Sequence, residues 1–197
     1  MSSVPEWLNS AIMPDARHAG LVIATQGAER GFGRGGFNLT SPAFDAGEEL
    51  DPCFTADEED AVAPPLEWTA PPPGTQELVI IVEDGSSTGA EPTCHWLVWG
   101  LPGQKGKLLE GEVPPRVGKN SLGNSEWLLP DLPEAETHQF VFQLFALDLP
   151  LTLMPGAKRA DLLAEMEGHV IASTTLVAPY TRSQEDEGDW DDAEDDD

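Results

Sequence analysis

Four apolar segments of strand length, separated by stretches rich in proline and glycine, set the strongest limit on the fold of this chain. They read ELVIIVED (77–84), HWLVWG (95–100), HQFVFQLFALD (138–148) and HVIASTTLVAPY (169–180). Valine, isoleucine and aromatic residues dominate them, and turn residues stand between them, as is usual for strands. Because helical patterns are few, the sequence predicts a mostly β domain, either a sandwich or a barrel.

One helix is expected near the end of the domain, within residues 156–169. Leu162, Leu163 and Met166 form a single apolar stripe there, and Gly168 suits the position just past a helix end. A single short helix leaves the expected fold mostly β.

The two ends of the chain differ in composition from the rest. Residues 1–36 are expected to form a flexible arm, because GAERGFGRGG (27–36) holds five glycines in ten residues. A phosphate-binding glycine loop is the disfavoured alternative, since the following FNLTSPAF does not begin a helix. Residues 184–197 are expected to be a disordered acidic tail that aids solubility, with docking of Trp190 on a basic partner as the alternative. Residues 37–183 would then form the folded domain.

The net charge of the chain limits the classes of molecule that it is expected to bind. The chain carries 36 acidic and 10 basic residues, a formal net charge of −26. Such a charge repels nucleic-acid phosphates and anionic lipid headgroups, so general binding to nucleic acid or to a membrane surface is disfavoured. A small anionic ligand in a local pocket, or a protein partner, remains compatible with this charge.

Three features of the chain bear on its compartment. The N-terminus lacks the basic-then-apolar pattern of a signal peptide, and the longest aliphatic run, LVIIV (78–82), is too short to span a membrane. Cys53 and Cys94 do not make a disulfide framework. We therefore expect a soluble cytoplasmic protein with reduced thiols and no membrane insertion.

Three polar side chains stand at the ends of expected strands. Asp84 ends one strand, His95 opens the next, and His138 opens a third. If these strands are neighbours, the three side chains meet at one rim of the sheet. A carboxylate beside a histidine favours the charged imidazolium, so the pattern predicts a pocket for phosphate or another oxyanion. Unrelated histidines at strand ends are the alternative.

The same region of the sequence supports an active site or a metal site less well than it supports an anion pocket. Ser86 or Ser87 near His95 imitates a serine triad in composition, but the GxSxG nucleophile elbow is absent. The two histidines with Asp84 match a metal-binding facial triad only in residue type, without HxxxH or HxD spacing. The sequence therefore predicts a protein that is not an enzyme and that holds no metal or cofactor.

Five segments that follow one another over roughly residues 37–182 carry a family resemblance. They are FNLTSPAFDAGEELDPCFT, APPLEWTAPPPGTQELVIIVED, CHWLVWGLP, THQFVFQLFALD and ADLLAEMEGHVIA. In this order they resemble the phosphatidylethanolamine-binding protein family, and most of all its bacterial Raf kinase inhibitor-like branch. The resemblance implies a Greek-key β-sandwich with a small pocket at one end that binds phosphate-like groups. It also implies an association with kinase or protease inhibition, and a homodimer, since bacterial members often form one.

The resemblance assigns pocket residues. Asp84 corresponds to the first aspartate of the family's DPDAP turn, and Ser86 replaces the second aspartate. His95 corresponds to the histidine of the HW step, and His138 to the histidine of the HRY step. These matches imply that the polar centre of the family pocket is retained.

The surround of the pocket departs from the family pattern. Phe140 stands where HRY has tyrosine, and Gln139 where it has arginine. The GPxPP wall is replaced by LPDLP (129–133), which keeps Pro130 but has leucine in place of glycine. Two functions therefore remain. One is a ligand-binding module with a drifted anion pocket, and the other is an interaction or inhibitor protein that binds through its surface and acidic tail.

Overall fold

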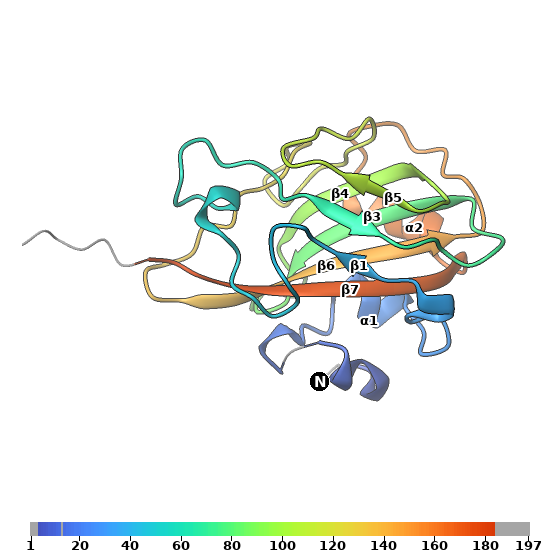
Figure 1. Cartoon of the computed structure of the whole chain (residues 1–197), viewed down its shortest axis with the longest axis horizontal. Coiled ribbons are helices and arrows are strands. Elements are labelled where there is room, and N and C mark those ends of the chain that lie inside the picture. The colour runs from blue at the N-terminus through green and yellow to red at the C-terminus, as the bar shows by residue number, and fades with distance from the viewer. Residues whose placement is uncertain (1–3, 13, 184–197) are drawn as a thin grey trace, which may run out of the picture.

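Two antiparallel sheets face each other in the structure, a computed structural model that describes residues 4–12 and 14–183 (Figure 1). The larger sheet has the order β4-β3-β6-β7, with β3 at Glu77–Asp84, β4 at Cys94–Pro102, β6 at Thr137–Leu147 and β7 at Val170–Thr181. The smaller sheet has the order β1-β2-β5, with β1 at Leu39–Thr40, β2 at Leu66–Trp68 and β5 at Gly106–Leu108. The expected mostly β sandwich is confirmed, and each of the four apolar segments corresponds to one strand of the larger sheet.

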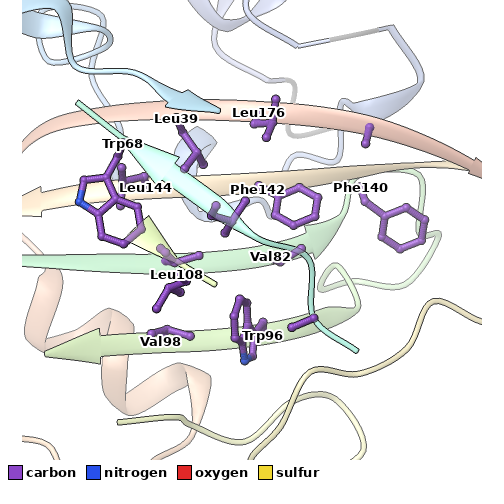
Figure 2. Close-up of a cluster of buried hydrophobic side chains, with 14 of the residues drawn as sticks. Leu39, Trp68, Val82, Trp96, Val98, Leu108, Phe140, Phe142, Leu144 and Leu176 are labelled. Carbon is purple, nitrogen blue, oxygen red and sulfur yellow. The ribbon is translucent and has the colours of Figure 1, made fainter. Parts of the chain in front are cut away.

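Side chains from the facing sheets form the main core. Figure 2 shows Leu39, Trp68 and Leu108 of the smaller sheet beside Val82, Trp96 and Phe142 of the larger one. Successive residues of a strand point to opposite faces, so Ile81 lies in a second apolar cluster behind the sheet, while Val82 lies in the main core. All eight residues of β3 are buried, because both faces of this strand are covered. A strand covered on both faces has a continuous apolar sequence, as ELVIIVED does.

The N-terminal residues pack on the outer face of the larger sheet (Figure 1). They form two 3₁₀ helices, η1 (Glu6–Ser10) and η2 (Pro14–Ala16), followed by the short helix α1 (Val22–Gln26). Their apolar side chains join the second cluster together with Ile81, and Leu8, Leu21 and Ile23 are fully buried.

This packing corrects the expectation of a flexible arm over residues 1–36, as far as those residues are described. The apolar side chains of the segment have no regular period, because the segment changes direction after each short helix. The glycines occupy defined turns, with Gly33 and Gly35 at φ values of 65° and 66°. In such turns glycine serves a backbone geometry that other residues avoid, so the glycines of this stretch have a structural role.

Helix α2 (Arg159–Met166) completes the outer layer. Leu162 and Met166 are fully buried against the sheet, and Leu163 is partly buried. Gly168 follows the helix end at a φ of 78°, which is the position the sequence indicated for it. Two further 3₁₀ helices, η3 (Arg34–Gly36) and η4 (Pro52–Phe54), lie in the connections.

The outer edges of the larger sheet are covered by chain segments that are not strands. The backbone N–H of Gly33 donates to the carbonyl of Ser173 on β7 at 2.8 Å, and Ser173 donates to Gly31 at 3.0 Å. On the other edge Gly118 donates to the carbonyl of Leu97 on β4 at 2.9 Å. These bonds occupy backbone groups that would otherwise be open to pairing with another chain.

Three remaining expectations concern the thiols, the membrane and the tail. Cys53 and Cys94 are both free thiols. Throughout the part of the chain that the structure describes, no helix is long and apolar enough to cross a membrane. The expected acidic tail, with Trp190, lies outside the described residues.

Candidate functional site

The pocket that contains the three candidate polar residues lies at one end of the larger sheet. Because β3 runs antiparallel to both β4 and β6, the end of β3 lies beside the beginnings of its two neighbours. Asp84 is the last residue of β3, His95 is the second residue of β4, and His138 is the second residue of β6. All three line one hollow of about 490 Å³.

Asp84 and His138 form a direct pair. The Nδ1 atom of His138 lies 2.5 Å from Oδ2 of Asp84, and the other carboxylate oxygen accepts the N–H of Ser86 at 2.8 Å. On its far side, Nε2 of His138 lies 3.4 Å from Oε2 of Glu136. The imidazole therefore stands between two carboxylates, and each of its ring nitrogens faces a carboxylate oxygen.

His95 is in a different environment. Its Nδ1 lies 2.7 Å from the carbonyl oxygen of Leu128, so this nitrogen carries the hydrogen and Nε2 carries the lone pair of the neutral ring. The edge of its ring meets the ring of Phe140, with centroids 5.1 Å apart. Burial lowers the pKa of His95, and this effect outweighs the opposing effects of the Leu128 carbonyl and of Asp84. His95 is thus a neutral hydrogen-bond acceptor near neutral pH, and becomes a second donor only when it gains a proton.

The remaining charges at the pocket come in pairs. Its lining includes three carboxylates and two imidazoles, and none of these described lining residues is a lysine or arginine. Asp131 is paired with Arg182 at 2.8 Å, and Glu91 lies 4.0 Å from Arg159. With Asp84 paired to His138, no carboxylate of the lining stands without a basic neighbour. An oxyanion entering the pocket would therefore meet no lysine or arginine of the described lining, and His95 could donate to it from Nε2 only after gaining a proton.

Comparison with known proteins gives the chain its family. The family model described as phosphatidylethanolamine-binding protein matches residues 40–181. The chain belongs to this family. A UPF0098 protein of Methanothermobacter thermautotrophicus is 32% identical over 155 residues, which cover 74% of this chain and 99% of the relative. A UPF0098 protein of Chlamydia trachomatis is 30% identical, with 73% of this chain and 98% of the relative covered.

Two solved structures are similar to this member of the phosphatidylethanolamine-binding protein family. A homologue of the family from Chlamydia trachomatis has a TM-score of 0.69 at 30% identity, covering 75% of this chain and 98% of its own. Escherichia coli YbcL has a TM-score of 0.66 at 20% identity, covering 74% and 98%, and shares the fold. Membership in the phosphatidylethanolamine-binding protein family supports a ligand-binding or regulatory module.

Three residues that the sequence assigned to the pocket of this family member do not line it. The hydroxyl of Ser86 faces away, donating to the carbonyl of Asp15 at 2.7 Å and accepting the N–H of Gln139 at 2.9 Å. Pro130 is buried, and its carbonyl accepts the N–H of Ala56 at 2.9 Å. Phe140 is fully buried, and its ring packs against the ring of His95. The polar groups of Ser86 and Pro130 are thus used in loop packing, and Phe140 supports the pocket through His95.

The structure also places residues at the site that the sequence did not single out. Glu136 reaches His138 from two positions earlier in the chain, and the alternation of side chains along an extended segment is a signal that identifies such a neighbour. Ser87, which the sequence offered only as a weak nucleophile candidate, lines the pocket, whereas Ser86 does not. Leu122 and Leu128 form an apolar wall together with Leu129, the leucine that the resemblance placed at the start of the LPDLP wall, and no pattern in the sequence connects Leu122 to the histidines.

The serines near Asp84 have structural roles in the turn after β3. The hydroxyl of Ser87 donates to the carbonyl of Asp84 at 2.7 Å and accepts the N–H of Thr93 at 3.1 Å. Neither serine hydroxyl is hydrogen-bonded to His95 or His138 in the described structure. Among residues 4–12 and 14–183, no three side chains of histidine, cysteine, aspartate or glutamate gather closely enough to hold a metal ion.

Proposed function

We propose that this protein is a non-enzymatic module that binds a small phosphate-bearing ligand in the pocket of Asp84, His95 and His138. The observation that carries the proposal is that three strands bring these side chains to one hollow, where Asp84 fixes the orientation of His138. A carboxylate that holds one ring nitrogen of a histidine sets which atom the ring presents to a ligand.

Binding in this pocket would be coupled to a proton. The oxygens of a phosphate dianion only accept hydrogen bonds, whereas neutral His95 presents a lone pair at Nε2. A proton on His95, or on the phosphate itself, turns this repulsive contact into a hydrogen bond. Because burial lowers the pKa of His95, a bound anion would raise that pKa, and affinity would increase as the pH falls.

Titration followed by histidine side-chain NMR tests the proposal. The probes are inorganic phosphate and phosphoethanolamine, each at pH 6 and pH 8, with ethanolamine as the ligand that lacks phosphate. We expect the side-chain resonances of His95 and His138 to shift saturably with each phosphate ligand. The affinity obtained from these curves should be higher at pH 6 than at pH 8, and His95→Ala should abolish binding.

The matched control is His169→Ala. His169 is a half-exposed histidine paired with Asp148 at 2.9 Å and does not line the pocket, so binding should be unchanged. The absence of shifts at millimolar phosphate, or an affinity that is equal at both pH values, would contradict the proposal. Equal responses to phosphate and phosphoethanolamine would assign recognition to the phosphate alone.

A further inference from the structure

A second hollow lies beside the pocket and is lined by exposed apolar side chains. Five large apolar residues of the described chain are exposed, and three of them, Val62, Val113 and Leu122, line this hollow of about 410 Å³. Val113 is 83% exposed and Leu122 is 71% exposed. Scattered exposed apolar residues are ordinary, but several around one concavity are typical of a binding surface.

Two tryptophans lie at the base of this hollow, which we call the tryptophan groove. Trp96 on β4 and Trp127 pack edge to face, with ring centroids 5.7 Å apart. Residues 61–63, residues 111–114, Leu122 and residues 124–129 line the groove together with Trp96. A hydrogen bond from the N–H of Gly111 to the carbonyl of Ala63 at 2.9 Å joins the first two of these segments. The groove therefore has an aromatic base and defined walls.

Leu122 is held in its exposed position by the structure of its turn. The buried side chain of Asn120 accepts the N–H of Leu122 at 3.0 Å and that of Asn124 at 3.2 Å. Its amide nitrogen donates to the carbonyl of Glu126 at 3.0 Å. One asparagine thus satisfies three backbone groups and fixes the backbone of the turn that carries Leu122. A fixed backbone loses little further freedom when a partner covers the side chain that it carries.

The charge around the groove indicates the charge that a partner should carry. Glu112 and Glu126 line it, and the described lining residues include no lysine or arginine. A third acidic residue, Glu110, directly precedes Gly111 of the lining. The nearby Arg116 is directed elsewhere, donating to the carbonyl of Leu151 at 3.5 Å. A partner that carries positive charge complements this rim.

We propose that the tryptophan groove docks a polypeptide segment with one or two large apolar side chains flanked by lysine or arginine. The apolar side chains lie between Val113 and Leu122 above the tryptophans, and the basic side chains face Glu112 and Glu126. The same acidic rim disfavours an anionic lipid surface and a second copy of this chain. The groove shares Leu122, Leu128 and Leu129 with the phosphate pocket, but its occupancy does not rest on the pocket binding an anion.

Fluorescence anisotropy of labelled peptides on the full chain tests this inference. The first peptide has a Leu-Phe-Leu centre with two lysines on each side. The second replaces the lysines by glutamates, and the third replaces the centre by Gly-Ser-Gly. We expect saturable binding of the first peptide only, at least tenfold tighter than either of the others, and weaker as salt is added.

Substitutions at the groove identify the binding surface. Leu122→Ser and Val113→Ser should each weaken binding of the first peptide at least fivefold. Met154→Ser is the matched control, because Met154 is a comparably exposed apolar residue that does not line the groove. The double variant Glu112→Lys with Glu126→Lys should shift the preference toward the glutamate peptide. All five substituted residues are exposed, so thermal unfolding should show that the variants remain folded.

Three results would overturn the inference. Unchanged affinity in Leu122→Ser would place peptide binding elsewhere, such as on the acidic C-terminal residues. Equal binding of the first and third peptides would show attraction by charge alone. A concentration-dependent dimer in sedimentation that Leu122→Ser abolishes would assign the groove to a second copy. Phosphate titration of His95 and His138 in these variants separates failure of the groove from failure of the pocket.

Discussion

Glu83 and Asp84 are adjacent in the chain, yet their side chains lie on opposite faces of β3. Glu83 points to the outer layer, where it accepts hydrogen bonds from Arg159 at 2.9 Å, from Gln143 at 2.8 Å and from the N–H of Val22 at 2.9 Å. Asp84 points to the pocket and holds His138. The end of one strand therefore anchors the N-terminal segment on one side and orients the binding site on the other.

Loss of Arg159 should strongly destabilise the fold. Glu83 is fully buried, and burial raises its pKa even though Arg159 acts in the opposite direction. Arg159→Met leaves an uncompensated carboxylate, which costs about 3–5 kcal/mol for a buried pair. We expect a loss of this size in the free energy of unfolding at pH 7, measured by urea denaturation.

The matched double variant separates charge from packing. Glu83→Gln together with Arg159→Met removes both charges and should recover at least half of the lost stability. The loss in Arg159→Met should also shrink as the pH falls toward 5, because a carboxyl group with a raised pKa is stabilised in its protonated form. A loss that is the same in the single and double variants would show that Arg159 acts through packing alone.

Titration of His95 should make stability fall in mild acid. Burial lowers the pKa of His95 in the folded protein below its ordinary value of 6.5, so the unfolded chain binds the proton more readily. Neutral His95 makes its full contribution to the free energy of unfolding above pH 6.5. This contribution is lost as the pH falls from 6.5 toward the pKa of His95 in the folded protein. One proton changes the unfolding free energy by at most about 1.4 kcal/mol per pH unit.

His95→Asn tests this dependence, because its side-chain amide retains a donor for the Leu128 carbonyl. Between pH 7 and pH 5 the variant should lose stability less steeply than the wild type in urea unfolding. Equal slopes for the wild type and His95→Asn would contradict the role assigned to His95.

A methyl group at Gly85 should disturb the contact between the turn after β3 and the N-terminal segment. A Cβ atom at Gly85 would lie 2.7 Å from the carbonyl oxygen of Ala16 and 2.8 Å from its Cα. Backbone atoms cannot move aside as a flexible side chain can, so Gly85→Ala should cost about 1–3 kcal/mol of stability. Amide hydrogen exchange should also become faster in residues 14–23.

Gly89→Ala in the same turn is the control for this prediction. Its Cβ would meet only the carbonyl oxygen of Glu91 within 4 Å, at 3.3 Å, and a small shift relieves that contact. We expect a cost below about 1 kcal/mol, the usual range for a substitution away from special features. Equal losses of stability in Gly85→Ala and Gly89→Ala would contradict a specific contact between Gly85 and Ala16.

Both thiols should resist alkylation in the folded protein. Burial is the main cause that raises the pKa of Cys53 to about 12, with Asp51 adding to it, and burial raises the pKa of Cys94 to about 12 as well. Because only the thiolate reacts, iodoacetamide at pH 8 should label each cysteine roughly a hundredfold more slowly than in the urea-unfolded chain. Mass spectrometry follows the labelling, and rapid native labelling of Cys53 would contradict the raised pKa.

The strands, the helix and the polar centre of the site could be predicted from the sequence. The apolar runs predicted β3, β4, β6 and β7, because a strand that is buried on both faces has a nearly continuous apolar sequence. The placement of Asp84, His95 and His138 at strand ends, together with the family resemblance, indicated residues that one hollow brings together. What could not be predicted was the supporting role of Ser86, since the direction of a hydroxyl in a turn depends on the partners that packing supplies.

The sequence by itself determined the class of the fold and the strands that carry the site, because periodicity and burial are local properties of a chain. Only the tertiary structure decided that the N-terminal segment covers the sheet, that Leu128 fixes His95, and that Leu122 and Val113 meet at one groove. Those contacts join segments far apart in the chain. They depend on how surfaces fit after the strands have paired, and no local pattern of residue types records that fit.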